Sequence, residues 1–254
     1  MVFSRLIVNA DDFGYSVAVN RAIMSSFESA LLTSTSIMAN MPGFDHAVGL
    51  IRRHPFLQQK VGLHLNLTEG FPLSRTLMAC PTFCGEDGRL IYDRDRSLFR
   101  LGRREREAVY EELRTQLERV LAAGIRPSHL DSHHHVHTEW AIVPLVCRLA
   151  RRYDIRRIRL SRNMGRVPSR AKRWYKKLFN YWFLGRRSGL ADNTDYFGDI
   201  SDLNYFLNTT KKKHSQGLSF EIMVHPLFDP MGRLVDYDGK DLRQELQLFT
   251  PIDP

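Results

Sequence analysis

The 254-residue sequence lacks long hydrophobic runs and has few cysteines. No stretch approaches the ~20 consecutive apolar residues that a membrane-spanning helix needs. The segment Met1–Ala10 has too short an apolar run for a secretory signal and no small-residue cleavage site. Cys80, Cys84 and Cys147 are too few and too irregularly spaced for a disulfide framework or a structural zinc site, which predicts free thiols. Together, these absences predict a cytoplasmic location.

Acidic residues are scarce in one part of the chain. Arg148–Arg187 contains fifteen Lys or Arg residues and one acid, Asp154, whereas the whole chain has a net charge of +9. Such a positive field attracts phosphates, anionic lipid headgroups or nucleic acid. The sequence has no DNA- or RNA-binding motif, so we expect no nucleic-acid partner.

Within this basic segment, Arg170–Leu184 interleaves aromatic residues with cations. The pattern fits an amphipathic helix lying on a membrane surface. It fits equally well a solvated basic face whose aromatic residues pack on the domain. The cations assigned to binding an anionic partner are Arg170, Lys172, Arg173, Lys176 and Lys177.

Segments of strand type alternate with segments of helical period. The expected strands are Leu6–Asn9, Thr33–Asn40, Val61–Leu67, Ser128–His137, Ile155–Leu160 and Leu218–Val224. The expected helices are Ala18–Phe27, Arg103–Ala123 and Ala141–Tyr153. This alternation predicts an α/β fold with a parallel sheet, either open or closed as a barrel. We expect residues 1–254 to form one domain, with irregular inserts at about 71–97 and 161–190 over the functional face.

Two adjacent carboxylates, Asp11 and Asp12, follow the first expected strand. In parallel α/β folds the carboxyl ends of the strands are where active sites form. Neighbouring residues on a strand point in opposite directions, but a strand end or turn can direct both side chains into one cavity. One carboxylate could then bind a metal while the other acts as a base. A loop pair or helix cap explains such a pair more often when it stands alone.

Histidine is concentrated in the run His129–His137, where five of nine residues are histidine. A period of two would place alternate residues of this run on one face: His129, Asp131, His133, His135 and His137. Imidazole is a common metal ligand, and a carboxylate such as that of Asp131 can fix its tautomer. His64 belongs to another expected strand and His225 comes at the end of a third, so three strand ends can deliver Asp and His to one open metal site.

Five segments, in order and spread over most of the chain, carry a family resemblance. They are Leu6–Gly14, Leu32–Ser36, Val61–Thr68, His129–His137 and Glu221–Pro226. Together they resemble the YdjC-type carbohydrate deacetylases, which are related to chitooligosaccharide deacetylases and, more distantly, to polysaccharide deacetylases. The resemblance implies a (β/α) barrel, complete or distorted, with its active site at the carboxyl ends of the parallel strands. It also implies hydrolysis of the acetamido group of an N-acetylated sugar, with release of acetate.

The resemblance also implies roles for individual residues. By this resemblance, the metal ligands are Asp12, His64 and His133. The general base is Asp11, and the acid or oxyanion-stabilising group is His225. The residues expected to support these ligands or to replace one of them are His129, Asp131 and His135. One divalent ion is implied: Zn²⁺ suits the histidines, and Mg²⁺, Co²⁺ or Ni²⁺ suits a site with one carboxylate and open water positions.

Two other functions remain open at this point. A metal-dependent phosphoesterase would use the same ligand types, but two-metal sites need more bridging carboxylates than Asp11, Asp12 and Asp131 clearly supply. A non-catalytic glycan- or membrane-binding relative would need neither Asp11 nor His225. The sequence also leaves open an anionic or lipid-linked glycan substrate, peripheral contact with the inner face of the membrane, and a homodimer.

Overall fold

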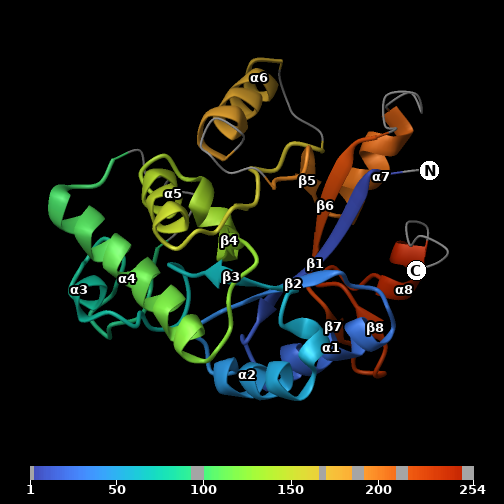
Figure 1. The fold of residues 1–254 in the computed structure, drawn as a ribbon, viewed down its shortest axis with the longest axis horizontal. Coiled ribbons are helices and arrows are strands. Elements are labelled where there is room, and N and C mark those ends of the chain that lie inside the picture. Colours follow the sequence, from blue (N-terminus) through green and yellow to red (C-terminus); the bar gives the residue numbers. More distant parts are fainter. Residues whose placement is uncertain (1–2, 93–99, 166–169, 185–191, 210–216, 248–254) are drawn as a thin grey trace.

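A six-stranded parallel sheet forms the centre of the molecule (Figure 1). The computed structural model describes residues 3–92, 100–165, 170–184, 192–209 and 217–247. The strands of the sheet are β1 (Arg5–Phe13), β2 (Ser34–Ile37), β3 (Val61–Leu65), β4 (Leu130–Ser132), β5 (Tyr196–Gly198) and β6 (Ser219–Val224). Their order is β4-β3-β2-β1-β6-β5, and the sheet curls into an incomplete (β/α) barrel, which confirms the predicted fold class. A separate antiparallel pair consists of β7 (Leu227–Phe228) and β8 (Leu234–Val235).

Helices surround this sheet. They are α1 (Val17–Glu28), α2 (Phe44–Arg53), α3 (Arg75–Met78), α4 (Arg103–Ala122), α5 (Val143–Arg152), α6 (Arg170–Phe179), α7 (Ile200–Thr209) and α8 (Leu242–Gln247). Figure 1 shows α4 and α5 on the side of β3 and β4, and α7 beside β5 and β6. The predicted apolar stripe of α4 is buried, with Val109, Leu113 and Leu117 all in the core. No helix in the described part of the chain is long and apolar enough to cross a bilayer.

Of the two strands expected on either side of α5, one is shorter than predicted and the other is not a regular strand. Of Ser128–His137, only β4 is a strand, and a 3₁₀ segment follows it at His133–Thr138. Within that segment, His134 and His135 have left-handed φ values of 51° and 55°. The alternation that would place the odd-numbered histidines on one face therefore ends at β4. Ile155–Leu160 makes a single parallel bridge, between Ile158 and Leu130, and is otherwise irregular.

The irregular segment that follows α5 spans the gap in the barrel. The Arg159 N–H donates to the Leu130 carbonyl at 2.9 Å, which holds the segment against β4. The Asn163 N–H donates to the Phe197 carbonyl at 3.0 Å, which holds it against β5. The two edge strands are therefore joined without a regular seventh strand. The expected insert at 161–190, for which no regular period was predicted, contains α6.

Candidate metal centre and active site

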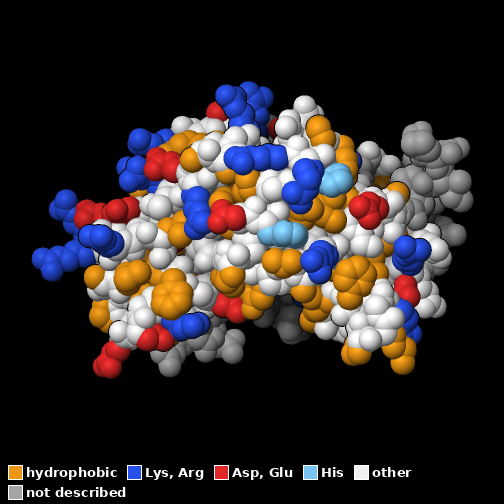
Figure 2. All heavy atoms as spheres, turned by 90° about the horizontal axis from the view of Figure 1, so that it is seen from below, with side chains coloured by type: hydrophobic (Ala, Val, Ile, Leu, Met, Phe, Trp, Pro, Cys, Tyr) orange, Lys and Arg blue, Asp and Glu red, His pale blue; other side chains and the backbone are white. Residues whose placement is uncertain are grey.

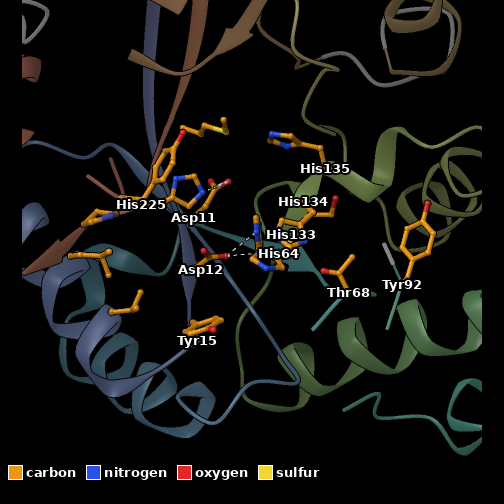
Figure 3. Close-up of a pocket in the computed structure, with 16 residues that line it drawn as sticks. Asp11, Asp12, Tyr15, His64, Thr68, Tyr92, His133, His134, His135 and His225 are labelled. Carbon is orange, nitrogen blue, oxygen red and sulfur yellow. Dashed lines mark hydrogen bonds and ion pairs between the residues drawn. The ribbon is translucent and has the colours of Figure 1, made fainter. Parts of the chain in front are cut away.

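An irregularity near the end of β1 turns two successive carboxylates toward one cavity. The register between β1 and β2 shifts between Ala10 and Phe13, so β1 has one extra residue at that point. Such bulges redirect side chains. Asp12 adopts a left-handed φ of 69°, which an aspartate tolerates better than most residues. As a result, Asp11 and Asp12 both line a cavity of about 780 Å³ at the carboxyl ends of the strands (Figure 3).

Asp12, His64 and His133 bring three potential metal-binding atoms together. His64 Nε2 lies 3.2 Å, and His133 Nδ1 3.1 Å, from Asp12 Oδ1. The three ligating atoms lie within 4.8 Å of one another, and the side chains come from β1, β3 and the end of β4 (Figure 3). Burial alone would raise the pKa of Asp12, but hydrogen bonds from the two imidazoles hold that pKa well below its usual range. The cluster therefore presents an ionised carboxylate beside two imidazole nitrogens.

Each histidine of this cluster has a second carboxylate on its other nitrogen. His64 Nδ1 lies 2.8 Å from Asp131 Oδ1, and His133 Nε2 lies 3.1 Å from Glu69 Oε2. Glu69 in turn accepts a hydrogen bond from the Tyr15 hydroxyl at 2.6 Å. Carboxylates placed in this way fix the imidazole tautomer and leave the facing nitrogen available to a metal. Glu69 and Tyr15 were not predicted from the sequence.

Negative charge surrounds His64. Burial disfavours its imidazolium form, but the carboxylates of Asp131, Asp12 and Asp11 outweigh burial and raise the pKa of His64 to about 10. His64 therefore keeps its proton, because three carboxylates lie close to its ring. A divalent cation between Asp12 and the two histidines would satisfy the same excess of negative charge, so the residues fit the implied metal ion.

Arg159, which was not predicted as a site residue, occupies the interior of the barrel. Its Nη1 and Nη2 donate to Asp11 Oδ2 and Oδ1 at 2.6 and 2.7 Å. Nη2 also lies 2.8 Å from Asp131 Oδ2, and Nε donates to Glu221 Oε1 at 2.7 Å. The whole residue is only 1% exposed. One guanidinium therefore joins β1, β4 and β6. The sequence signals were three arginines interspersed with aliphatic residues in Ile155–Leu160 and an acid within apolar β6.

Asp11 is both buried and held in place. Besides Arg159, the Asn9 side-chain amide donates to Asp11 Oδ1 at 2.8 Å. Burial alone would raise the pKa of Asp11, but the Arg159 guanidinium outweighs burial and holds that pKa well below its usual range. Asp11 is therefore ionised, with Oδ2 lying 4.0 Å from His225 Nε2.

His225 follows β6 and faces the metal-binding cluster across the cavity (Figure 3). Its backbone N–H donates to Asp236 Oδ1 at 2.6 Å, and its ring lies edge-on to Tyr237 with 5.2 Å between centroids. Its Nδ1 is buried without a hydrogen-bond partner among the described residues, 4.0 Å from Asp236 Oδ1. The imidazole of His225 is thus positioned by Asp236 and Tyr237. A small rotation of the ring would bring Nδ1 into contact with the Asp236 carboxylate.

The other histidines of the run lie outside the three-residue cluster. His129 is fully buried, and its ring occupies the space beside Gly62, where a Cβ atom would lie 2.3 Å from the imidazole. His137 is also buried, and its Nδ1 lies 2.6 Å from a serine hydroxyl. His134 and His135 line the same cavity as the cluster. Of the two histidines proposed from the sequence as alternative ligands, His129 therefore lies outside this cavity, whereas His135 lines it without belonging to the group of Asp12, His64 and His133.

The basic segment Arg148–Arg187 supplies less surface charge than its composition suggests. Arg159 is buried among three carboxylates, and Arg162 pairs with Asp199 and Asp202. On the face seen in Figure 2, Lys and Arg side chains are spread over the surface with Asp and Glu side chains among them. Arg159 is therefore an internal structural group, and the charge of Arg162, whose side chain is 39% exposed, is balanced by two acids.

The five cations assigned to an anionic partner are only partly described. The side chains of Arg170, Lys172 and Arg173 lie outside the described residues. Lys176 donates to the Arg162 carbonyl at 2.6 Å. Lys177 is exposed, and its Nζ lies 5.4 Å from the centroid of the Trp174 ring.

Comparison with known proteins agrees with this geometry. A family model described as YdjC-like protein matches residues 5–250. A carbohydrate deacetylase of Brevibacillus brevis is 44% identical over 151 residues, which cover 59% of this chain and 57% of that relative. A carbohydrate deacetylase of Halalkalibacterium halodurans is 34% identical over 224 residues, covering 88% of this chain and 85% of the relative.

A solved structure extends the comparison to the fold. It is a protein of Enterococcus faecalis V583 described as a proposed cellobiose-phosphate cleavage protein. It superposes with a TM-score of 0.67 at 26% identity and covers 89% of this chain and 82% of its own. The family match spans nearly the whole sequence, including every residue of the Asp–His cluster. The chain therefore belongs to the YdjC-like family.

Proposed function

We propose that this YdjC-like protein is a metal-dependent hydrolase that removes the acetyl group from an N-acetylated sugar and releases acetate. The observation that carries the proposal is the cluster of Asp12, His64 and His133 in one cavity with an ionised Asp11 and the imidazole of His225. The names of the relatives support a carbohydrate deacetylase. We further propose that residues 1–254 act as a single catalytic domain, in keeping with one continuous hydrophobic core.

In this proposal, Asp12 and the facing nitrogens of His64 and His133 hold one divalent ion. Such an ion would supply Lewis-acid polarisation of the acetamide carbonyl and lower the pKa of a water molecule. Two imidazoles and one carboxylate form a donor set that suits Zn²⁺, and the same set accepts Co²⁺, Ni²⁺ or Mg²⁺. Asp131 and Glu69 orient the two imidazoles from behind.

The protein's own groups then move two protons. Asp11 accepts a proton from the attacking water as the water oxygen bonds to the acetamide carbon. His225, in its protonated form, donates a proton to the amide nitrogen as the carbon–nitrogen bond breaks, which leaves acetate and the sugar amine. Asp11 Oδ2 and His225 Nε2 are 4.0 Å apart, so both groups can reach one small reacting centre. Arg159 fixes Asp11 and keeps it ionised.

Removing the metal should abolish activity. Protein treated with a chelator is expected to release no acetate from N-acetylglucosamine oligomers, and activity should return after addition of one equivalent of the correct ion. Testing Zn²⁺, Mg²⁺, Co²⁺ and Ni²⁺ separately, with metal content measured by mass spectrometry, identifies the ion. We expect one ion per chain, and loss of at least about 100-fold in metal affinity for Asp12→Asn, because a first ligand matters more than the 10–100-fold typical of supporting groups.

Asp45→Asn is the matched control for that substitution. The Asp45 side chain is 91% exposed and remote from the cavity, so this change should leave metal content unaltered. Full activity in the chelated protein would reject the metal-dependent mechanism. Stoichiometric metal in Asp12→Asn would reject Asp12 as a ligand.

The alternative hypothesis, a metal-dependent phosphoesterase, has less support from the site. Among the described residues, a second group of potential ligands, Asp11, His64 and Asp131, shares His64 with the first. Arg159 already pairs with Asp11 and Asp131, so a cation occupies that position. Phosphate diesters should therefore be hydrolysed no faster than background by the metal-loaded protein.

We also propose that α6 rests on an anionic lipid surface. Its inner side packs through Phe179 against Trp140, with 5.4 Å between ring centroids. Its outer side exposes Trp174, which is 62% exposed, together with Leu178 one turn later, and the exposed Tyr181 follows in the adjoining π-helical turn Asn180–Leu184. An apolar stripe flanked by cations such as Lys177 is the pattern of helices that lie in a membrane interface.

Exchanging the outer side of α6 tests this contact. Trp174→Ala combined with Lys177→Gln is expected to weaken binding to vesicles that contain anionic lipid, while turnover on a small neutral N-acetyl sugar stays unchanged. Raising salt to 1 M should also weaken the wild-type contact, because the Debye length falls from ~10 to ~3 Å. Met231→Ala alters an exposed hydrophobic residue outside α6 and serves as control. Equal binding of all three proteins would reject the proposal.

A further inference from the structure

A second cavity lies at the opposite end of the sheet from the candidate active site. Its volume is about 330 Å³. It is lined by residues at the amino ends of β1 and β2 and by residues just before β3 and β4, including Arg5, Ser34, Lys60 and Ser128. The catalytic cavity opens at the carboxyl ends of the same strands. The two cavities share no lining residue.

Arg157 is the unusual group in this second cavity. It lines the cavity, yet only 6% of the residue is exposed. Its guanidinium makes no hydrogen bond and no ion pair with any described residue, although it has five N–H donors. Burial lowers the pKa of Arg157. Buried arginines normally pair with an acid, as Arg159 does two residues later, so an unpaired one calls for a partner from outside the chain.

Two further cations complete the lining. Arg5 and Lys60 are exposed and make no ion pair with a described carboxylate; Arg5 Nη1 lies 3.4 Å from the Asp192 carbonyl oxygen. Lys60 Nζ lies 5.5 Å from the Phe56 ring. Among the described residues of the lining, Asp192 is the one acid.

We propose that this cavity is a binding site for a phosphoryl group, separate from the active site. Among the described lining residues, three cations face one carboxylate, an excess of two positive charges that matches a dianion. Outside the lining, the carboxylates of Glu221 and Asp131 also attract the Arg157 guanidinium, but both are paired with Arg159. The planar guanidinium of Arg157 can donate two parallel hydrogen bonds to phosphate oxygens, and the hydroxyls of Ser34 and Ser128 can add others. The volume exceeds that of inorganic phosphate, so the phosphate ester of a small molecule also fits.

The binding is measured by calorimetry on the chelated protein, so that a metal in the active site cannot contribute. Inorganic phosphate and glucose 1-phosphate are titrated separately, with glucose as the neutral comparison. One saturable site is expected for either phosphate and none for glucose. Tighter binding of glucose 1-phosphate would identify an ester as the ligand, and equal binding would identify inorganic phosphate.

Variants then locate the site. Arg157→Gln is expected to weaken phosphate binding by about tenfold or more, the loss of a charge-assisted, two-point contact. Lys60→Gln, an exposed change that preserves the fold, should weaken it by a smaller factor. Arg104→Gln alters an exposed arginine on α4, away from the cavity, and should bind as the wild type does.

Thermal unfolding provides a readout that is independent of deacetylase activity. Arg157→Met removes an unpaired buried charge, so without phosphate its Tm should equal or exceed that of the wild type. Phosphate should raise the Tm of the wild type and not that of Arg157→Met, relative to chloride at equal ionic strength. The absence of saturable phosphate binding by the wild type, or equal binding by the wild type, Arg157→Gln and Lys60→Gln, would overturn the proposal whether or not the protein is a deacetylase.

Discussion

Arg159→Met is expected to lower the free energy of unfolding by about 3–5 kcal/mol, the usual result of removing one partner from a buried ionic group. Asp11, Asp131 and Glu221 would then face one another in the interior without a cation. Methionine reproduces the unbranched stem of arginine but not its charged end, so the loss reports mainly on charge and hydrogen bonding. Urea unfolding at neutral pH measures the change.

An exposed ion pair provides the comparison for Arg159. Arg114→Met removes the i,i+4 pair between Arg114 and Glu118, whose side chains are 39% and 45% exposed, and should cost ~0.5 kcal/mol or less. Arg159→Lys should recover only part of the stability, because one ammonium group cannot reproduce the contacts of three guanidinium nitrogens. Equal unfolding energies for Arg159→Met and the wild type would show that the three carboxylates do not need the cation.

Asp11→Asn is expected to reduce kcat for acetate release by about 10²–10⁴-fold, the range typical of a lost general base. The substitution preserves shape but cannot accept a proton. Because Asp11 lies outside the Asp12, His64 and His133 cluster, metal content should remain at the wild-type level. Steady-state acetate release and metal analysis on the same sample measure both quantities.

Comparison with Asp12→Asn distinguishes the role of general base from that of metal ligand. Asp12→Asn should lose metal together with activity, whereas Asp11→Asn should lose activity alone. Because Asp11 contacts Arg159, the fold of Asp11→Asn must be checked. Equal thermal unfolding midpoints for Asp11→Asn and the wild type would exclude a general loss of structure. Turnover near the wild-type rate in metal-loaded Asp11→Asn would rule out this residue as the base.

Periodicity and strand-end position predicted a large part of the fold. The apolar stripe of α4 and the runs that became β1, β3 and β6 were recognisable because burial on one or both faces dictates their composition. The prediction that Asp11 and Asp12 turn into one cavity also follows from local chemistry, and a bulge in β1 provides the means. These features depend on residues close together in the sequence.

The features that escaped prediction depend on partners far apart in the sequence. Ile155–Leu160 has a strand-like composition, but Arg159 turns inward to three carboxylates whose positions only the folded chain defines. The left-handed conformations of His134 and His135 likewise end the strand alternation that the composition of the histidine run predicts. Glu69 approaches His133 from 64 residues away, with no local signal in the sequence.

The pairing of β1 with β6 has a consequence for synthesis on the ribosome. Residues Arg5–Ala10 pair with Ser219–Val224. The first strand to be synthesised, β1, therefore cannot complete its pairing until β6 has been synthesised. Contacts so distant along the chain are slow to form, because a long loop must close first. Until then, one edge of β1 is open to pairing with other chains. A nascent chain that stalls before β6 emerges would therefore carry Arg5–Ala10 as an unprotected strand edge, prone to aggregation and open to chaperone binding.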